Sequence, residues 1–228
     1  MSLGERLAAV RSRLAAACVA NARDSSAITL VAVSKQHPAD RVREALALGQ
    51  RAFGENRVQE LVAKATALAH LQPSWHMIGS VQTNKVRDLL GVPGLALLHS
   101  LDRDGLADAL QVRLATHPHR RLACLIEVNA SGDATKHGVA PNDAGALLAH
   151  VLSDCPSLEV RGLMAMGPLA SDPRPVFGGV VRLRDDLVQR IGRPLPVLSL
   201  GMSDDLEAAI AAGSTMVRVG TSIFGDRH

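Results

Sequence analysis

The chain has 228 residues, of which 47% are hydrophobic, and 25 Lys and Arg residues nearly balance 22 Asp and Glu, for a formal net charge of +3. This composition suits one α/β domain, and because the sequence contains neither a run of about 18 apolar residues nor an N-terminal apolar segment with a cleavage site, we expect no membrane span and no conventional secretion. Basic residues are scattered and only 2% of residues are aromatic, so we expect no nucleic-acid partner, which would favour clustered basic charge and stacking rings.

The first predicted element is a helix within residues 1–23. Four arginines in this segment give it a superficial resemblance to a transit peptide. An apolar stripe with the 3.6-residue period of a packed helix face favours a structural helix instead. The stripe consists of Leu3, Leu7, Val10, Leu14 and Cys18.

Eight extended segments follow, and helical patterns fill the gaps between them. Runs such as "ITLVAVS", "LACLIEV" and "TMVRVG" are apolar nearly throughout, as expected when helices cover one face of a sheet and a packed interior covers the other. The predicted strands lie near residues 28–34, 51–54, 75–78, 95–99, 121–129, 158–163, 196–199 and 215–219. The predicted helices cover about 38–49, 56–70, 82–90, 103–115, 141–152, 173–191 and 203–212.

This strict alternation predicts a single (β/α)8 TIM-type barrel over residues 1–228, with the N-terminal helix packed on it. An open, doubly wound sheet is the alternative, because spacing alone does not establish closure. Residues 167–175, "GPLASDPRP", form the most loop-like stretch. In a barrel of this kind, chemistry takes place at the C-terminal ends of the strands.

The cysteine and histidine patterns predict the compartment and argue against a metal site. Cys18, Cys124 and Cys155 are odd in number, widely spaced and without a CxxC pair, which favours a reducing compartment, and hence the cytoplasm, over a cysteine zinc site. The nine histidines are dispersed, and His117 and His119 lie in "THPHRR", which has the composition of a solvated loop. We therefore expect no metal.

Lysine is rare in this chain, which contains 21 arginines but only four lysines. Lysine can lose its proton and form a Schiff base, whereas arginine cannot act as a nucleophilic amine. Lys35, Lys85 and Lys136 each follow a predicted strand. The structural interpretation of Lys35, an ammonium held in water above an apolar stem, stays open, but a place at a barrel-strand end makes it the first candidate for chemistry.

The loops after the last two predicted strands, "LSLGMSDD" and "VRVGTSIFG", have the composition of a phosphate site. Barrels often bind phosphate there: Gly220 permits close backbone approach, and Ser203 and Thr221 supply hydroxyls. The structural alternative is that Ser203 and Asp204 cap the following helix. A lysine facing a phosphate site across a barrel mouth is compatible with pyridoxal phosphate or with a Schiff-base aldolase acting on a sugar phosphate.

The sequence resembles the pyridoxal-phosphate homeostasis protein family, a single barrel similar to the N-terminal domain of alanine racemase. The resemblance runs nearly end to end and is carried by "AVSK", "FGENRVQE", "WHMIGSVQTNKV", "VNASGDATKHG", "RGLMAMG" and "SLGMSDDLEAAIAAGSTMVRVGTSIFG". Ser80-Val81 and Met166-Gly167 depart mildly from the family pattern, and these departures concern only the cavity wall.

The resemblance implies a set of cofactor contacts. Lys35 would form the Schiff base with pyridoxal phosphate, and Arg218 would face the pyridine nitrogen. Because arginine stays charged, that nitrogen would remain unprotonated and the cofactor would be a poorer electron sink. Lys136 falls on the family's second lysine of interest. The implied cofactor-binding residues are Lys35, Asn56, Ser203, Arg218, Gly220 and Thr221.

Two functional classes follow from the resemblance. The first is a carrier that binds pyridoxal phosphate and affects its supply to apo-enzymes that depend on it, and we expect such a carrier to be a monomer. The second is a pyridoxal-phosphate-dependent racemase or related enzyme. Racemisation needs acid/base groups on both faces of the substrate carbanion, and the chain contains no tyrosine. We therefore expect a carrier without catalytic residues, although His76 and Lys136 stay open as second bases.

Overall fold

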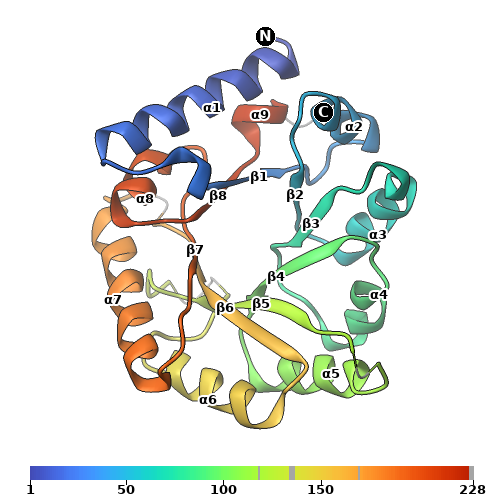
Figure 1. The fold of residues 1–228 in the computed structure, drawn as a ribbon, viewed down its shortest axis with the longest axis vertical. Helices are drawn as coiled ribbons and strands as arrows, with labels where there is room; N and C mark the ends of the chain where they lie inside the picture. The colour runs from blue at the N-terminus through green and yellow to red at the C-terminus, as the bar shows by residue number, and fades with distance from the viewer. Residues whose placement is uncertain (118, 134–136, 169, 226–228) are drawn as a thin grey trace.

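The computed structural model describes residues 1–117, 119–133, 137–168 and 170–225. Within these ranges eight parallel strands pair in chain order, and β8 pairs with β1 to close a barrel (Figure 1). The strands are β1 (Thr29–Val33), β2 (Ala52–Glu55), β3 (Ser74–Met77), β4 (Leu95–Leu101), β5 (Leu122–Val128), β6 (Leu158–Ala165), β7 (Val197–Ser199) and β8 (Met216–Val219). The predicted barrel is confirmed, and the open-sheet alternative is wrong.

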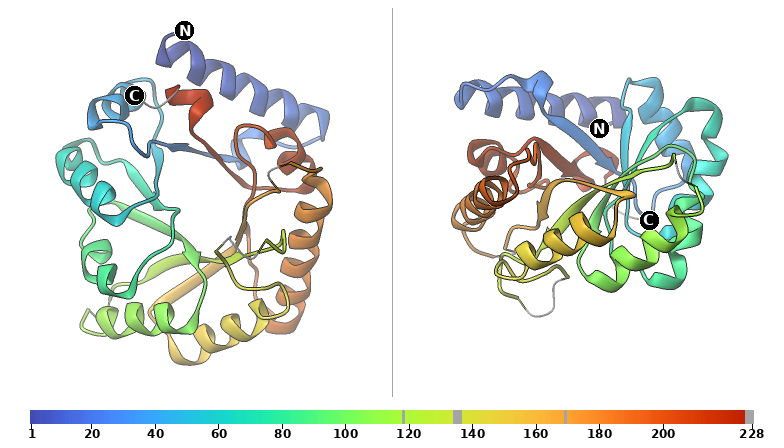
Figure 2. Two further views of the ribbon diagram at one scale, coloured as in Figure 1. Left: turned by 180° about the vertical axis from the view of Figure 1, so that it is seen from behind. Right: turned by 60° about the horizontal axis from the view of Figure 1, so that its bottom comes forward.

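Helices form a ring around the strands, as both end-on views show (Figures 1 and 2). Apolar side chains of the helices and of the outward strand faces make the main core between the two layers. The helices are α1 (Leu3–Ala20), α2 (Ala39–Ala47), α3 (Val58–Ala67), α4 (Val86–Leu90), α5 (Asp104–Leu114), α6 (Ala144–Asp154), α7 (Arg174–Ile191), α8 (Leu206–Ala212) and α9 (Thr221–Phe224).

The predicted N-terminal helix is present as α1 and packs on the barrel through the predicted stripe. Its buried residues include Leu3, Leu7, Val10, Leu14 and Cys18, and it contacts α8 and α9. Ser2 and Glu5 form a capping box at its start, and Arg6 Nε donates to the carbonyl oxygen of Ile223 in α9 at 2.9 Å. The helix therefore supports the two elements that follow β7 and β8.

The barrel interior is apolar at one level and polar at the next. Alternate residues of a strand share a face, so a side chain two positions past an interior residue also points inward. One apolar cluster includes Leu97, Leu125 and Met216. Two residues further toward the C-terminal strand ends lie the buried side chains of His99, Glu127 and Arg218.

Several helices differ from the sequence predictions. The helix predicted at 203–212 begins only at Leu206, so the capping role considered for Ser203 and Asp204 is wrong: Asp205 is the N-cap residue, and its carboxylate accepts from the Met202 amide at 2.5 Å. The helix predicted at 82–90 divides into a 3-10 turn, Thr83–Lys85, and α4. The short α9 was not predicted. No helix of the described ranges is long and apolar enough to cross a membrane.

Candidate functional site

A cavity of about 380 Å³ opens at the C-terminal ends of the strands. Val33 and Lys35 contribute one wall from β1 and its following turn, and Met164 and Met166 contribute an apolar wall from β6 and the residues after it. All six of the residues predicted as cofactor contacts lie around this cavity: Lys35, Asn56, Ser203, Arg218, Gly220 and Thr221. The structure thus brings the predicted set together, while their individual roles stay predictions.

The loops after β7 and β8 supply one end of the cavity. Ser203 is half-buried in the turn before α8, and Gly220 precedes the first residue of α9, Thr221. The first amide groups of a helix have no acceptor within the helix itself, and they favour negative charge. A Cβ added at Gly220 would lie 3.2 Å from the carbonyl oxygen of Val33, so glycine keeps this loop close to β1.

Arg218 forms the base of the cavity and is held rigidly. Its NH1 group donates to both the carbonyl oxygen and the hydroxyl of Ser199 at 2.6 Å, and NH2 donates to the carbonyl oxygen of Ala165 at 3.0 Å. Burial lowers the pKa of Arg218 to about 10, although Asp205 and Glu127 act in the opposite direction. The guanidinium therefore remains charged at neutral pH.

A hydrogen-bonded chain of neutral groups continues from Arg218 into the barrel. Ser199 Oγ lies 3.0 Å from His99 Nδ1, and His99 Nε2 lies 2.9 Å from His76 Nδ1. Arg218 only donates, so we assign the Ser199 proton to the bond with His99 and the ring protons of both histidines to Nε2. Burial lowers the pKa of His76 to about 4 and that of His99 well below its ordinary value. Both histidines are neutral near pH 7.

Glu127 is a further ionisable group of the barrel interior. It is 4% exposed, and within the described part of the chain its Oε2 atom has no hydrogen-bond partner. Burial raises its pKa from 4.5 to about 7, and Asp102 adds to this rise while Arg218 opposes it. The folded chain therefore binds a proton at Glu127 more tightly than the unfolded chain does.

We expect Glu127→Gln to stabilise the fold at pH 8 by up to about 3 kcal/mol, the free energy equivalent of that pKa difference. The raised pKa means that this group's stabilising contribution is complete below about pH 4.5 and is lost as the pH rises through about 7. The gain should therefore shrink toward zero at pH 5. Urea unfolding at both pH values measures it, with the exposed Glu159→Gln as control. A gain of equal size at both pH values would contradict the assignment.

The other lysines and polar residues considered from the sequence are distributed differently. Lys85 and Asn56 line a neighbouring, more polar hollow, and the Lys85 ammonium lies 4.0 Å from the Asp88 carboxylate. His76 is buried in the interior chain rather than at the cavity wall. Lys136 lies outside the described residues.

Three possible metal ligands that sequence spacing did not bring together do meet on the outside of the barrel. Single donor atoms of Asp108, His150 and Cys155 lie within 4.8 Å of one another. His150 is already paired through both ring nitrogens, with Asp108 at 2.8 Å and Asp154 at 3.2 Å. The hydrogen bond to Asp108 raises the His150 pKa, so proton binding competes with a metal ion for the ring nitrogens. The absence of a metal site stays a prediction.

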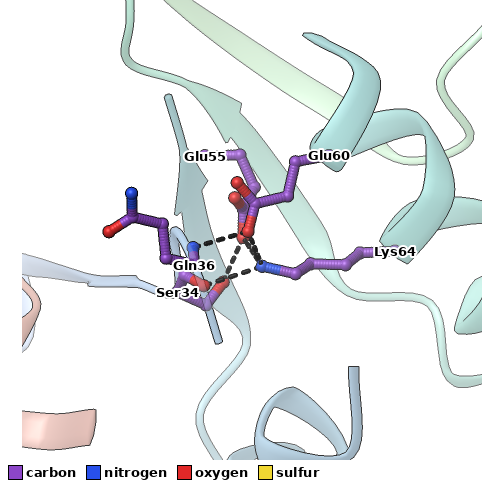
Figure 3. A network of polar contacts seen from close by, with 5 residues as sticks. All are labelled: Ser34, Gln36, Glu55, Glu60 and Lys64. Carbon is purple, nitrogen blue, oxygen red and sulfur yellow. Dashed lines mark hydrogen bonds and ion pairs between the residues drawn. The ribbon is translucent and has the colours of Figure 1, made fainter. Parts of the chain in front are cut away.

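Lys64 is the lysine that sequence analysis passed over, and the structure places it behind the turn that carries Lys35. Its Nζ donates three hydrogen bonds of 2.7 Å, to Ser34 O, Glu55 Oε1 and Glu60 Oε1 (Figure 3). Burial raises the Glu55 pKa, and the Lys64 charge opposes that rise. Only the i,i+4 spacing of Glu60 and Lys64 could have indicated this cluster from the sequence.

The alanine racemase N-terminal domain family matches residues 7–228. A pyridoxal phosphate homeostasis protein of Aquifex aeolicus is 42% identical over 100% of this chain and 99% of its own length. One of Bos taurus is 42% identical over 100% of this chain and 88% of its own length.

Among solved structures, PipY of Synechococcus elongatus with pyridoxal phosphate bound superposes with a TM-score of 0.84 and 35% identity, covering 98% of this chain and 100% of PipY. Sequence and fold thus agree over nearly the whole length. The chain belongs to the pyridoxal phosphate homeostasis protein family, whose barrel is that of the alanine racemase N-terminal domain.

Proposed function

We propose that this chain binds pyridoxal phosphate in the cavity at the barrel mouth and holds it as a Schiff base on Lys35. Through this binding it takes part in the intracellular homeostasis of vitamin B6. The observation that carries the proposal is the convergence of one lysine, one buried arginine and two donor-rich loops on a single cavity. The bound pyridoxal phosphate of the similar PipY structure supports it.

The residues present fit this cofactor end to end. Ser203, Gly220 and Thr221 line the part of the cavity beside the start of α9, where hydroxyl and amide donors suit a phosphate. Lys35 supplies the amine for a carbonyl, and Asn56 supplies a further polar contact. The cofactor, when bound, supplies an aldehyde and an electron-withdrawing ring.

Arg218 favours binding over turnover. Its fixed guanidinium would donate to the ring nitrogen and could not readily give up a proton to it. A carrier that supplies pyridoxal phosphate to apo-enzymes in the cytoplasm is the role that this arrangement supports. The racemase alternative is favoured only by the shared barrel, and the monomeric state stays a prediction.

Replacing Gly220 should separate phosphate recognition from ring recognition. Because a Cβ at Gly220 already meets the Val33 carbonyl oxygen at 3.2 Å, the larger side chain of Gly220→Val would displace the loop from its position beside β1. We expect pyridoxal phosphate to bind about 100-fold more weakly, about 2.7 kcal/mol, and unphosphorylated pyridoxal to change by less than about threefold. Absorbance titrations with both ligands measure the two affinities.

The matched control is Gly105→Val, because an added Cβ at Gly105 meets nothing within 4 Å and α5 lies away from the cavity residues. It should leave both affinities unchanged. Equal weakening of both ligands by Gly220→Val would argue against a phosphate site in these loops.

A further inference from the structure

Lys35 lies in a tight turn, and the residues on either side of it are hydrogen-bonded to side chains of β2 and α3. The amide of His37 donates to the carbonyl oxygen of Ser34 at 3.0 Å, which makes Lys35 and Gln36 the two central residues of a four-residue turn. Gln36 has a φ of +65°, a left-handed conformation that type II turns require at this position and that usually selects glycine. The chain uses glutamine here, so the turn needs support from elsewhere.

That support comes from the cluster of Glu55, Glu60 and Lys64, which lies on the helix side of the barrel (Figure 3). Glu60 Oε1 accepts from the Gln36 amide at 2.6 Å. Glu55 Oε1 accepts from the Ser34 hydroxyl at 2.6 Å, and Lys64 Nζ donates to the Ser34 carbonyl oxygen at 2.7 Å. The residues immediately before and after Lys35 are therefore both fixed by this cluster.

Burial makes the cluster rigid and interdependent. Lys64 is 5% exposed and Glu55 is fully buried. A lysine ammonium has three donors, and all three are used here, on Ser34, Glu55 and Glu60. Removing either Lys64 or Glu55 would leave the other as an uncompensated buried charge, so these two hold each other in place, and Glu60 adds a third contact from the more exposed side.

The turn directs the side chains of Ser34 and Lys35 to opposite sides of the strand layer. Ser34 points toward α3 and the charge cluster, and Lys35, the next residue, lines the cavity on the opposite face. Fixing the backbone on both sides of Lys35 limits the directions in which its amine can reach. A small displacement of a reacting group from its productive position can cost as much as about 100-fold in rate.

We propose that Glu60, together with Glu55 and Lys64, acts as a set of positioning residues that orient the Lys35 amine toward the carbonyl carbon of the cofactor. The inference rests on the proposed function, because it assigns these residues to the Schiff-base step and to no other. They contact the turn, and none of the three lines the cavity. Their loss should therefore impair capture of the aldehyde while leaving recognition of the phosphate and the ring intact.

The test uses Glu60→Ala, because the Glu60 side chain is 22% exposed and its loss leaves the buried Lys64–Glu55 pair in place. Each variant is titrated with pyridoxal phosphate and with 4′-deoxypyridoxine 5′-phosphate, which keeps the phosphate and ring but has no aldehyde. We expect the rate of Schiff-base formation, and the affinity for pyridoxal phosphate, to fall about tenfold or more, and the affinity for the deoxy analogue to stay within about twofold.

Two further variants make the result specific. Glu60→Gln keeps an oxygen acceptor for the Gln36 amide and should restore both quantities to within about threefold of the unmodified chain. Glu44→Ala removes a glutamate that pairs with Arg41 on α2 and should leave the affinity for both ligands unchanged. Together these outcomes support a positioning role, because a merely structural defect would weaken the binding of both ligands.

Equal weakening of both ligands by Glu60→Ala, no change in either, or a Glu60→Gln variant as weak as Glu60→Ala would overturn the positioning role. If the unmodified chain forms no adduct that borohydride can reduce, the proposed function itself fails, and the inference fails with it. The two failures are distinguishable because the second is visible before any variant is made.

Discussion

Lys35→Ala is expected to abolish covalent attachment of pyridoxal phosphate. Lys35 lines the cavity from the turn after β1, and an alanine there has no amine to attack a carbonyl. The loops after β7 and β8, which we propose bind the phosphate, are unchanged in this variant, so part of the cofactor should still bind noncovalently. The measurement is the absorbance spectrum before and after borohydride reduction, followed by peptide mass mapping. In the unmodified chain the label should lie on Lys35, and in the variant no peptide should carry a label.

The other lysines provide the controls for this experiment. Lys85→Ala removes an amine in the neighbouring hollow and should leave the reduced label on Lys35. Lys64 has all its donors engaged behind the turn, and we expect no label there. A reduced label on Lys85 or Lys136 of the unmodified chain would show that another lysine captures the cofactor.

The barrel could be predicted from the sequence because its strands are buried on both faces. Segments such as Leu122–Val128 are nearly continuous apolar runs, and this pattern needs no knowledge of the partner strand. Closure did not follow from spacing, because it depends on the pairing of β1 with β8 across almost the whole chain. Boundaries at polar turns were also missed, since Ser203 and Asp205 are equally suitable N-cap residues in a sequence.

The residues that line the cavity could be predicted from the sequence, whereas the buried residues that hold them in place could not. Lys35 and Gly220 stand at strand ends, where the position along the chain already indicates the cavity. The partners of Arg218 depend on which alternate residues of β4 and β7 face inward, so the contacts with Ser199 and His99 became visible only with the strand register. Lys64 has the sequence context of a solvated helix lysine, and only its burial shows otherwise.

The chain is expected to bind pyridoxal phosphate without turning over amino acids at an enzyme-like rate. A general acid or base contributes typically about 10²–10⁴-fold, and racemisation needs one on each face of the carbanion. Lys35 is one candidate, and the chain has no tyrosine to be the second. His76 is a poor substitute, because burial lowers its pKa to about 4 and its Nδ1 is engaged with His99 inside the barrel.

Arg218 would add to this deficit, because a guanidinium facing the ring nitrogen would stabilise its neutral form and leave less stabilisation for a carbanion. The measurement is incorporation of solvent deuterium at Cα of L- and D-alanine and of several other amino acids, with Lys35→Ala as the control. We expect exchange far below the usual enzyme range of about 1–10³ s⁻¹. Exchange or racemisation within that range, and lost in Lys35→Ala, would favour the racemase over the carrier, and the second base would then have to come from Lys136 or another residue outside the interior chain.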